Sequence, residues 1–454
     1  SFQMFLLLFL PLLSSVYVPS KEEKARRWDS LNRVGSVPDD DGLQLVFVNA
    51  MWRHGDRAAT LTMPGDVLNE GNWTFGGGGY GELSPIGMSQ HMNLGLLLRK
   101  MYVTDTPFLS MKYNSREIYV RSTDKNRTII SAYSNLIGMY STQNDTNDVN
   151  LFYPSDASWP SAYIPIAIHT NDQAHDHVAD PDAPCMRQDQ LWDLAHQTDE
   201  YISYDQSDFC QDTLKYLRNA TNSSDDAVTF DNIYIIWDNI LCETVHFPDN
   251  VNDWYPWYTP IVHDRTQEIN DRNIDLQNGI FIDGVIDGLD LTIEIPKIRG
   301  GPLLKDVYSN AMSALNCWRN SHLNDGTECG DDISYMNKRK YYAISGHDTT
   351  IAAYLTVLGA KSHVVKSPGY SSYSSSVITE FYVNTTSEAK TPLFRLLYHD
   401  NADSNPPFTV ITAFVDGCPL DSDYCNTSVL KQLSDKFDPG DIYQLCDTPI
   451  KATE

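Results

Sequence analysis

The sequence has few basic residues. Its 454 residues include 33 lysines and arginines against 60 aspartates and glutamates, a formal net charge of −27 at pH 7. So acidic a surface repels nucleic acid and anionic membranes, so neither is expected as a partner. An anionic substrate therefore needs a local group of cations set against the field of the whole chain. A second copy of the chain is a candidate partner, and the oligomeric state stays open.

Long apolar runs are also missing. No stretch reaches the roughly 18 apolar residues of a membrane-spanning helix, so no membrane anchor is expected. The short apolar run Phe5–Leu13 fits the core of a signal peptide. We therefore assign residues 1–20 as a signal peptide with an open cleavage site, and residues 21–40 as a polar linker.

Eight cysteines and several Asn-x-Ser/Thr sequons are typical of a protein that enters the secretory route, as the expected signal peptide also indicates. We expect a secreted protein, or one in the lumen of the secretory or lysosomal route, with disulfide bonds and N-linked glycans. The expected glycosylation sites are Asn72, Asn144, Asn219, Asn222, Asn384 and Asn426, and a seventh sequon begins at Asn126. Which of these sequons carry a glycan stays open.

Three segments rich in β-forming residues each end in a polar cluster that precedes a helical pattern. The expected strands are Leu43–Met51, Ile118–Val120 and Tyr341–Ser345. In an open α/β sheet, ligands bind beyond the carboxyl ends of the strands, near helix N-termini. We expect one helix to begin at Pro85 with Ser84 as its cap, and a second to be capped by Ser122 or Asp124. Six side chains are expected to converge at this edge: Arg53, His54, Arg57, Arg121, His347 and Asp348.

The cluster Arg53-His54-Gly55-Asp56-Arg57 suits an anionic phosphate ester. Two guanidinium groups can hold phosphoryl oxygens bidentately, and their charge should keep His54 neutral. A neutral imidazole can attack phosphorus, Asp348 can protonate the leaving oxygen, and His347 adds a donor. The simpler alternatives are a helix cap at Asp348 and a surface salt bridge at Arg121.

Residues 151–298 differ in character from the rest of the chain. They are rich in Asp, Asn, Trp and Tyr and contain few strand patterns. This composition predicts an inserted, mainly α-helical domain between the two parts of an α/β catalytic domain, residues 41–150 and 299–454.

Four segments together resemble the histidine acid phosphatases, in particular the branch with the prostatic and lysosomal enzymes. They are Leu45–Arg57, Leu83–Gly95, Tyr119–Thr128 and Ser345–Thr350. The resemblance implies a phosphoglycerate-mutase-like open sheet flanked by helices, with an inserted α domain. It implies a phosphohistidine at His54, Asp348 as proton donor, and no metal or other cofactor. It also implies that the phosphate is held by Arg53, Arg57, Arg121 and His347.

The same resemblance implies two disulfide bonds, Cys185–Cys446 and Cys418–Cys425. Cys317 and Cys329 bracket an apparent insertion, so a local pair there is sterically easy. Cys210 and Cys242 then remain as the last pair, and two buried thiols are the alternative. One departure from the family is Ala58-Ala59-Thr60, since relatives usually have proline soon after the second motif arginine.

Other patterns are weaker. Gly76, Gly78 and Gly81 match G-x-G-x-x-G but follow no strand, so a loop near the site is favoured over a dinucleotide site. His175 with His177, the aspartates at 283–290 and the aromatic run Trp254–Tyr258 are interpreted as surface or packing residues.

The sequence thus predicts a secreted acid phosphatase acting on small phosphate monoesters. The alternatives are a phytase-like specificity, which a charge of −27 disfavours, and a non-catalytic surface glycoprotein of the same family. The natural substrate stays open.

Overall fold

The computed structural model describes residues 42–141, 149–282, 284–323, 339–365, 369–387, 390–401 and 407–450. The expected signal peptide and linker, the sequon at Asn144 and Cys329 lie outside these ranges. Across the ranges, no helix is both long enough and apolar enough to cross a membrane.

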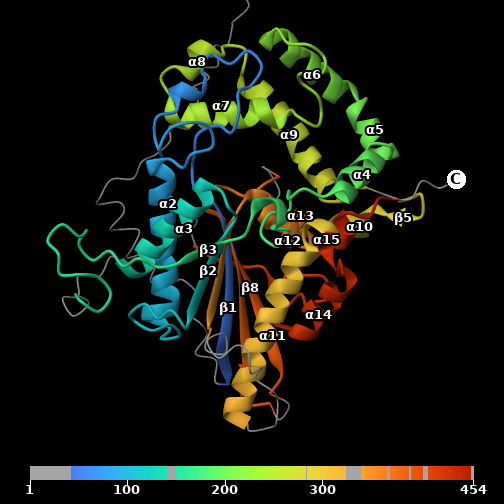
Figure 1. Cartoon of the computed structure of the whole chain (residues 1–454). Helices are drawn as coiled ribbons and strands as arrows, with labels where there is room; N and C mark the ends of the chain where they lie inside the picture. The colour runs from blue at the N-terminus through green and yellow to red at the C-terminus, as the bar shows by residue number, and fades with distance from the viewer. Residues whose placement is uncertain are drawn as a thin grey trace, which may run out of the picture.

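A mixed sheet forms the centre of the molecule (Figure 1). Its strand order is β10-β8-β7-β1-β6-β2-β3, with β9 paired to β8. Neighbours from β1 to β3 run parallel, and the remaining pairs are antiparallel. The strands are β1 Leu43–Arg53, β2 Ile118–Ser122, β3 Ile168–Thr170, β6 Tyr341–Gly346, β7 Ser376–Asn384, β8 Pro392–His399, β9 Thr409–Val410 and β10 Cys425–Asn426. The expected α/β class is confirmed.

Helices cover both faces of the sheet, which explains the unbroken apolar character of β1. Val48, Ala50 and Trp52 face α2 (Pro85–Arg99) and α3 (Asn126–Leu136). Phe47 and Met51 face the opposite side, because successive strand side chains alternate. The helices there are α11 (Gly301–Leu323), α12 (Asp348–Val357), α13 (Lys361–Val364) and α14 (Thr427–Lys436).

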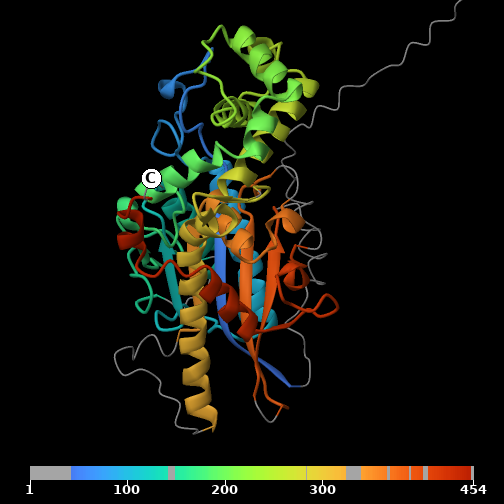
Figure 2. The same ribbon diagram turned by 90° about the vertical axis from the view of Figure 1, so that its right-hand side faces the viewer.

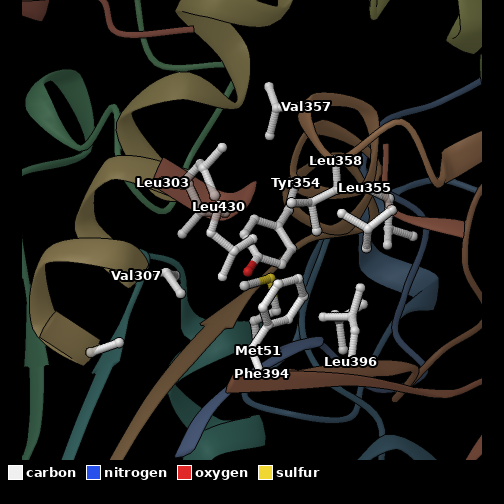
Figure 3. Close-up of a cluster of buried hydrophobic side chains, with 14 of the residues drawn as sticks. Met51, Leu303, Val307, Tyr354, Leu355, Val357, Leu358, Phe394, Leu396 and Leu430 are labelled. Atoms are coloured by element: carbon white, nitrogen blue, oxygen red, sulfur yellow. The ribbon is translucent and has the colours of Figure 1, made fainter. Parts of the chain in front are cut away.

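Figure 3 shows the core on this second face, where Met51, Tyr354 and Phe394 meet Leu303 and Leu430. Helix α11 runs along the length of the sheet (Figure 2). The strands that carry the motif residues are therefore held between two packed layers.

A group of helices lies beyond one end of the sheet, at the top of Figures 1 and 2. They fall within the predicted α insertion, although β3 also lies there and pairs with β2, so the predicted boundary at residue 151 precedes the last strand of the sheet. The segment after β1 joins this group through Met63 and Trp73. The helices of the insertion are α4 Met186–Ala195, α5 Asp199–Asp205, α6 Asp208–Thr221, α7 Tyr234–His246, α8 Val251–Trp254, α9 Pro260–Gln277 and α10 Leu291–Arg299, with the hairpin β4 Val285–Ile286 and β5 Leu289–Asp290. In Figure 1, α10 and the hairpin lie lower than the other helices, next to α12 and α15.

Two disulfide bonds expected from the resemblance are present. Cys185–Cys446 ties the start of α4 to α15 (Ile442–Cys446), and Cys418–Cys425 closes a short loop before β10. Cys317 is disulfide-bonded.

The expected pairing of Cys210 with Cys242 is wrong, because both are free, buried thiols. Cys210 packs among Leu214 and Phe230, whereas Cys242 packs against Ala58 and Trp73 in a different apolar cluster. Elimination by counting cannot detect that two thiols lie in separate clusters.

The helix caps were predicted with mixed success. Ser84 caps α2 as expected, accepting a hydrogen bond from the Gly87 N–H at 3.0 Å, with Pro85 as the first helical residue. Helix α3 begins instead after Lys125, without a side-chain cap. Ser122 is still part of β2, and its hydroxyl donates to the Thr123 carbonyl.

Candidate active site

The ends of β1, β6 and β2 lie side by side, as the strand-end motifs predict. Arg53 is in register with Gly346, and Ser122 with Ser345. Beyond the strands, the His54 N–H donates to the Gly346 carbonyl at 3.0 Å, and the Thr123 N–H donates to Ser345 at 3.1 Å. These backbone bonds fix the three turns to one another, so the side chains that follow share one edge of the sheet.

Gly55 lets the first turn approach helix α2. A Cβ on Gly55 would lie 2.5 Å from the Gly87 backbone, closer than real Cβ contacts allow. The chain can therefore place His54 against the start of α2 only with glycine here.

His54 is buried, with 2% of its surface exposed. Its Nδ1 lies 2.8 Å from the Gly55 carbonyl, an acceptor, so Nδ1 carries the hydrogen and Nε2 keeps its lone pair. Burial and the charges of Arg127, Arg53 and Arg57 hold its pKa well below the ordinary histidine value. The imidazole is thus neutral, as expected, and has the tautomer of a nucleophile at Nε2.

Arg53 is held on three sides. Its Nη1 donates to the Ser371 carbonyl at 2.7 Å, and its Nη2 lies 3.3 Å from Oδ2 of Asp348. The guanidinium stacks over the ring of Tyr373, 4.3 Å from the centroid, and lies 5.2 Å from that of Tyr370. This support fixes the direction in which Arg53 presents its remaining N–H groups.

Arg57 is held from the helical group above the sheet. Its Nη1 and Nη2 each lie 3.0 Å from a different carboxylate oxygen of Asp238 on α7. Nη1 also lies 3.5 Å from Sγ of Cys242. The motif arginine is therefore oriented by a residue 181 positions away in the sequence.

His347 and Asp348 stand at the start of α12. His347 is the N-cap residue, so the alternative of a helix cap at Asp348 is wrong. The Nε2 atom of His347 lies 3.0 Å from Thr123 Oγ1, and the centroid of the His347 ring is 5.7 Å from that of His54. Burial and the charge of Arg127 keep the pKa of His347 well below its ordinary value, so it too is neutral.

Asp348 keeps an accessible carboxyl group, with 27% of its side chain exposed. Burial raises its pKa, but the charges of Arg53 and Arg57, together with a hydrogen bond from the Thr349 N–H, outweigh that effect, and the net pKa is lowered. Without a bound anion the carboxyl is ionised.

The structure does not bring Arg121 into this group, and the expectation that it belongs there needs correction. Arg121 forms a buried ion pair with Asp176, and the groups that raise its pKa are Tyr342, Asp176 and Asp306. As a residue within β2, it projects from a face of the sheet instead of its edge.

Arg127 is the residue that sequence reasoning missed. It is the second residue of α3, and its charge lowers the pKa of both His54 and His347. Burial and the neighbouring Arg57 lower its own pKa to about 10. The signal was present, since Arg127 lies in the first turn of the helix after the second strand, where helix N-termini face the ligand edge.

Three buried arginines near His54 each have one N–H group without a hydrogen-bond acceptor among the described residues. In the part of the chain that the structure describes, Nε of Arg53, Arg57 and Arg127 is buried without a partner. Arg57 and Arg53 also lie close enough to Arg127 to lower its pKa. A group of buried cations with free donors is typical of an anion site. Among the described residues, no group of three or more His, Cys, Asp or Glu could hold a metal.

The glycine loop lies next to this site. Gly76, Gly78 and Gly81 all have positive φ, and the Gly81 N–H donates to the Ala59 carbonyl at 2.8 Å. A Cβ on Gly81 would lie 3.3 Å from Nη1 of Arg127. The prediction of a loop near the site is confirmed.

The remaining patterns have structural roles. His175 is exposed and lies 3.0 Å from Asp172. Asp290 caps α10. Trp254 packs against Phe247, and the Tyr255 hydroxyl donates to Asp66 at 3.2 Å.

Comparisons with known proteins find relatives along most of the chain. The family described as "Histidine phosphatase superfamily (branch 2)" matches residues 44–399. A Caenorhabditis elegans protein named "Putative acid phosphatase 10" is 33% identical over 421 residues, covering 91% of this chain and 96% of the relative. Lysosomal acid phosphatase of Xenopus laevis is 29% identical, covering 85% and 76%. Among solved structures, Hafnia alvei phytase in complex with myo-inositol hexakis sulphate has a TM-score of 0.58 at 17% identity, covering 90% and 99%, a likeness of fold.

Proposed function

Because the chain belongs to the histidine phosphatase superfamily (branch 2) and is a phosphatase, we propose that it hydrolyses small phosphate monoesters through a phosphohistidine at His54. The observation that carries the proposal is the neutral His54, with Nδ1–H on the Gly55 carbonyl and three arginines close enough to lower its pKa.

The first half of the reaction transfers the phosphoryl group to the enzyme. The Nε2 lone pair of His54 attacks phosphorus while Arg53, Arg57 and Arg127 hold the non-bridging oxygens. The bond from phosphorus to the leaving oxygen breaks, and protonated Asp348 gives its proton to that oxygen. The alcohol leaves, and Asp348 is left as a carboxylate.

The second half regenerates the enzyme. A water oxygen attacks the phosphorus, and Asp348 takes the proton of that water. The phosphorus–nitrogen bond breaks, its electron pair returns to Nε2, and inorganic phosphate leaves. Nδ1–H stays on the Gly55 carbonyl throughout, which supports the positive charge on the ring in the intermediate.

An acidic working range follows from Asp348. Its pKa is lowered in the free protein, so the acid form is scarce at neutral pH. A bound phosphate ester brings negative charge next to Arg53 and raises the pKa of Asp348, but low pH still favours the acid form. The rate of phosphate release from an aryl phosphate should decrease as the pH is raised from 5 to 8, and chelators should not abolish it. Undiminished activity at pH 8 would contradict the role of Asp348 as the acid.

We also propose that the protein follows the secretory or lysosomal route. The disulfide bonds suit an oxidising compartment, and Asn72, Asn219, Asn222 and Asn426 are exposed in the structure. Removing N-glycans enzymatically should increase the mobility of the secreted protein on a gel. A protein retained in the cytosol and unchanged by this treatment would refute the route.

A further inference from the structure

One face of helix α7 is directed at the turn that carries the catalytic motif. Asp238, Cys242 and His246 recur at intervals of four residues, so they share one side of the helix. Asp238 and Cys242 contact Arg57, and His246 Nε2 lies 2.8 Å from Oδ2 of Asp56. The helical group above the sheet thus reaches the motif turn at two adjacent residues.

We propose that Asp238 is a positioning residue that aims the guanidinium of Arg57 at the phosphate. The inference rests on the proposed function, because it assigns the support of a side chain that would hold the substrate. Asp238 touches Arg57 and acts on the reaction only through it.

The hydrogen bonds of Arg57 support this role. Asp238 takes one N–H from each Nη at 3.0 Å, and the Ala58 carbonyl takes another from Nη1 at 3.0 Å. The buried Nε has no partner among the described residues. A planar guanidinium with one edge on a carboxylate must present its Nε edge in a fixed direction, and that edge is left for a phosphoryl oxygen.

Charge supports it as well. Arg57 lowers the pKa of Arg53, and Arg57 and Arg53 both lower the pKa of Arg127, so like charges in this group repel one another. The negative charge of Asp238 raises the pKa of both Arg57 and Arg127 and offsets this repulsion. Only a carboxylate supplies both the charge and two acceptor oxygens.

The test replaces Asp238 and measures turnover and phosphate binding separately. Asp238→Asn should lower kcat/KM by about 10- to 100-fold and raise the Kd for inorganic phosphate, because a misplaced group costs that much in oriented catalysis. Asp238→Glu, which keeps the charge but displaces the carboxylate by one methylene, should fall between wild type and Asp238→Asn. If the Asp238→Asn protein fails to fold, the Asp238→Glu variant alone serves as the test.

A matched control is Asp231→Asn, because Asp231 also takes hydrogen bonds through both oxygens, from the Tyr201 hydroxyl, but lies outside the site. It should leave both constants unchanged. In an Arg57→Ala background, Asp238→Asn should add less than threefold further loss.

Two results would overturn the inference: Asp238→Asn within threefold of wild type in both constants, or a further tenfold loss on top of Arg57→Ala. Phosphate Kd from calorimetry needs no turnover. A wild-type protein that binds phosphate but forms no phosphohistidine would therefore refute the proposed function while the role of Asp238 is still measured.

Discussion

At the scale of single residues, the site depends on which atom of each group is left free. The Gly55 carbonyl takes Nδ1–H of His54 and leaves Nε2 available, while the arginines keep the ring neutral. The same arginine charge that favours a neutral histidine also favours an ionised Asp348. The positive environment therefore removes the proton from both groups, which suits the nucleophile but not the acid, and the bound phosphate ester must restore the acid.

Asp348→Asn tests the acid directly. We expect phosphate to bind and turnover to slow, by about 100-fold or more for an alkyl ester, because an alkoxide leaves poorly without a proton. A nitrophenyl ester should lose less, since nitrophenolate is a good leaving group. Steady-state kinetics on both esters decide the matter, and equal losses would count against the acid role.

The two arginines around β2 should fail in different ways. Arg127→Ala removes a cation of the site, so kcat/KM should fall by about 100-fold or more with little change in stability. Arg121→Ala leaves buried Asp176 without its ion-pair partner, so the free energy of unfolding should fall by about 3 kcal/mol. Urea unfolding and kinetics on both variants separate the roles. A fully active, equally stable Arg127→Ala protein would remove Arg127 from the site.

This contrast also shows where sequence reasoning stops. The motifs after three strands predicted a shared edge, because parallel strands end together, and β1, β6 and β2 do so. Choosing between Arg121 and Arg127 needs the point at which β2 ends, and strand ends are poorly defined by sequence. Arg121 falls inside the strand, whereas Arg127 falls on the helix that faces the site.

At the scale of elements, helix α7 links the helical group to the motif turn, and no sequence pattern predicted that contact. The same helix carries Glu243, whose fully buried carboxyl group lies beside Asp66 and Tyr255. Burial, together with the charge of Asp66 in the segment after β1, raises its pKa to about 8. The folded state therefore favours a protonated Glu243 over a wide pH range.

Glu243→Gln should change how stability depends on pH. A raised pKa gives stability that is fully present below the unfolded-state pKa of about 4.5 and is lost as pH rises towards 8. Relative to wild type, the variant should be no more stable at pH 4.5 and more stable at pH 8, by a few kcal/mol (about 1.4 kcal/mol per pKa unit). Denaturant unfolding across this range measures the difference, and parallel curves for the two proteins would show that Glu243 does not titrate as described.

At the scale of the whole molecule, the fold gathers three arginines at one edge of a chain with a net charge of −27. The sheet supplies Arg53 and His54, α3 supplies Arg127, and α7 orients Arg57. The net charge of the whole chain leads us to expect a small monoester as substrate, because a negative field opposes a highly charged anion such as phytate.

The disulfide Cys185–Cys446 joins the helical group to the C-terminal part across 261 residues. Removing it with Cys185→Ser and Cys446→Ser together should lower the free energy of unfolding by about 2–5 kcal/mol, since the closed loop is long. Activity should persist at low temperature, because both cysteines belong to the apolar cluster of the helical group and neither is among the residues that contact His54 or shift its pKa. Thermal unfolding and an aryl phosphate assay test both statements, and unchanged stability would mean that non-covalent packing between the two parts is sufficient to hold them together.

The central claim is a covalent intermediate on His54. Wild-type protein mixed with a phosphate monoester and quenched within milliseconds in alkaline denaturant should carry one alkali-stable, acid-labile phosphate. Peptide mass spectrometry should locate this phosphate on His54. His54→Ala should carry none and turn over several orders of magnitude more slowly. Phosphate found on another residue, or a His54→Ala protein that keeps more than about a tenth of the wild-type rate, would contradict the account.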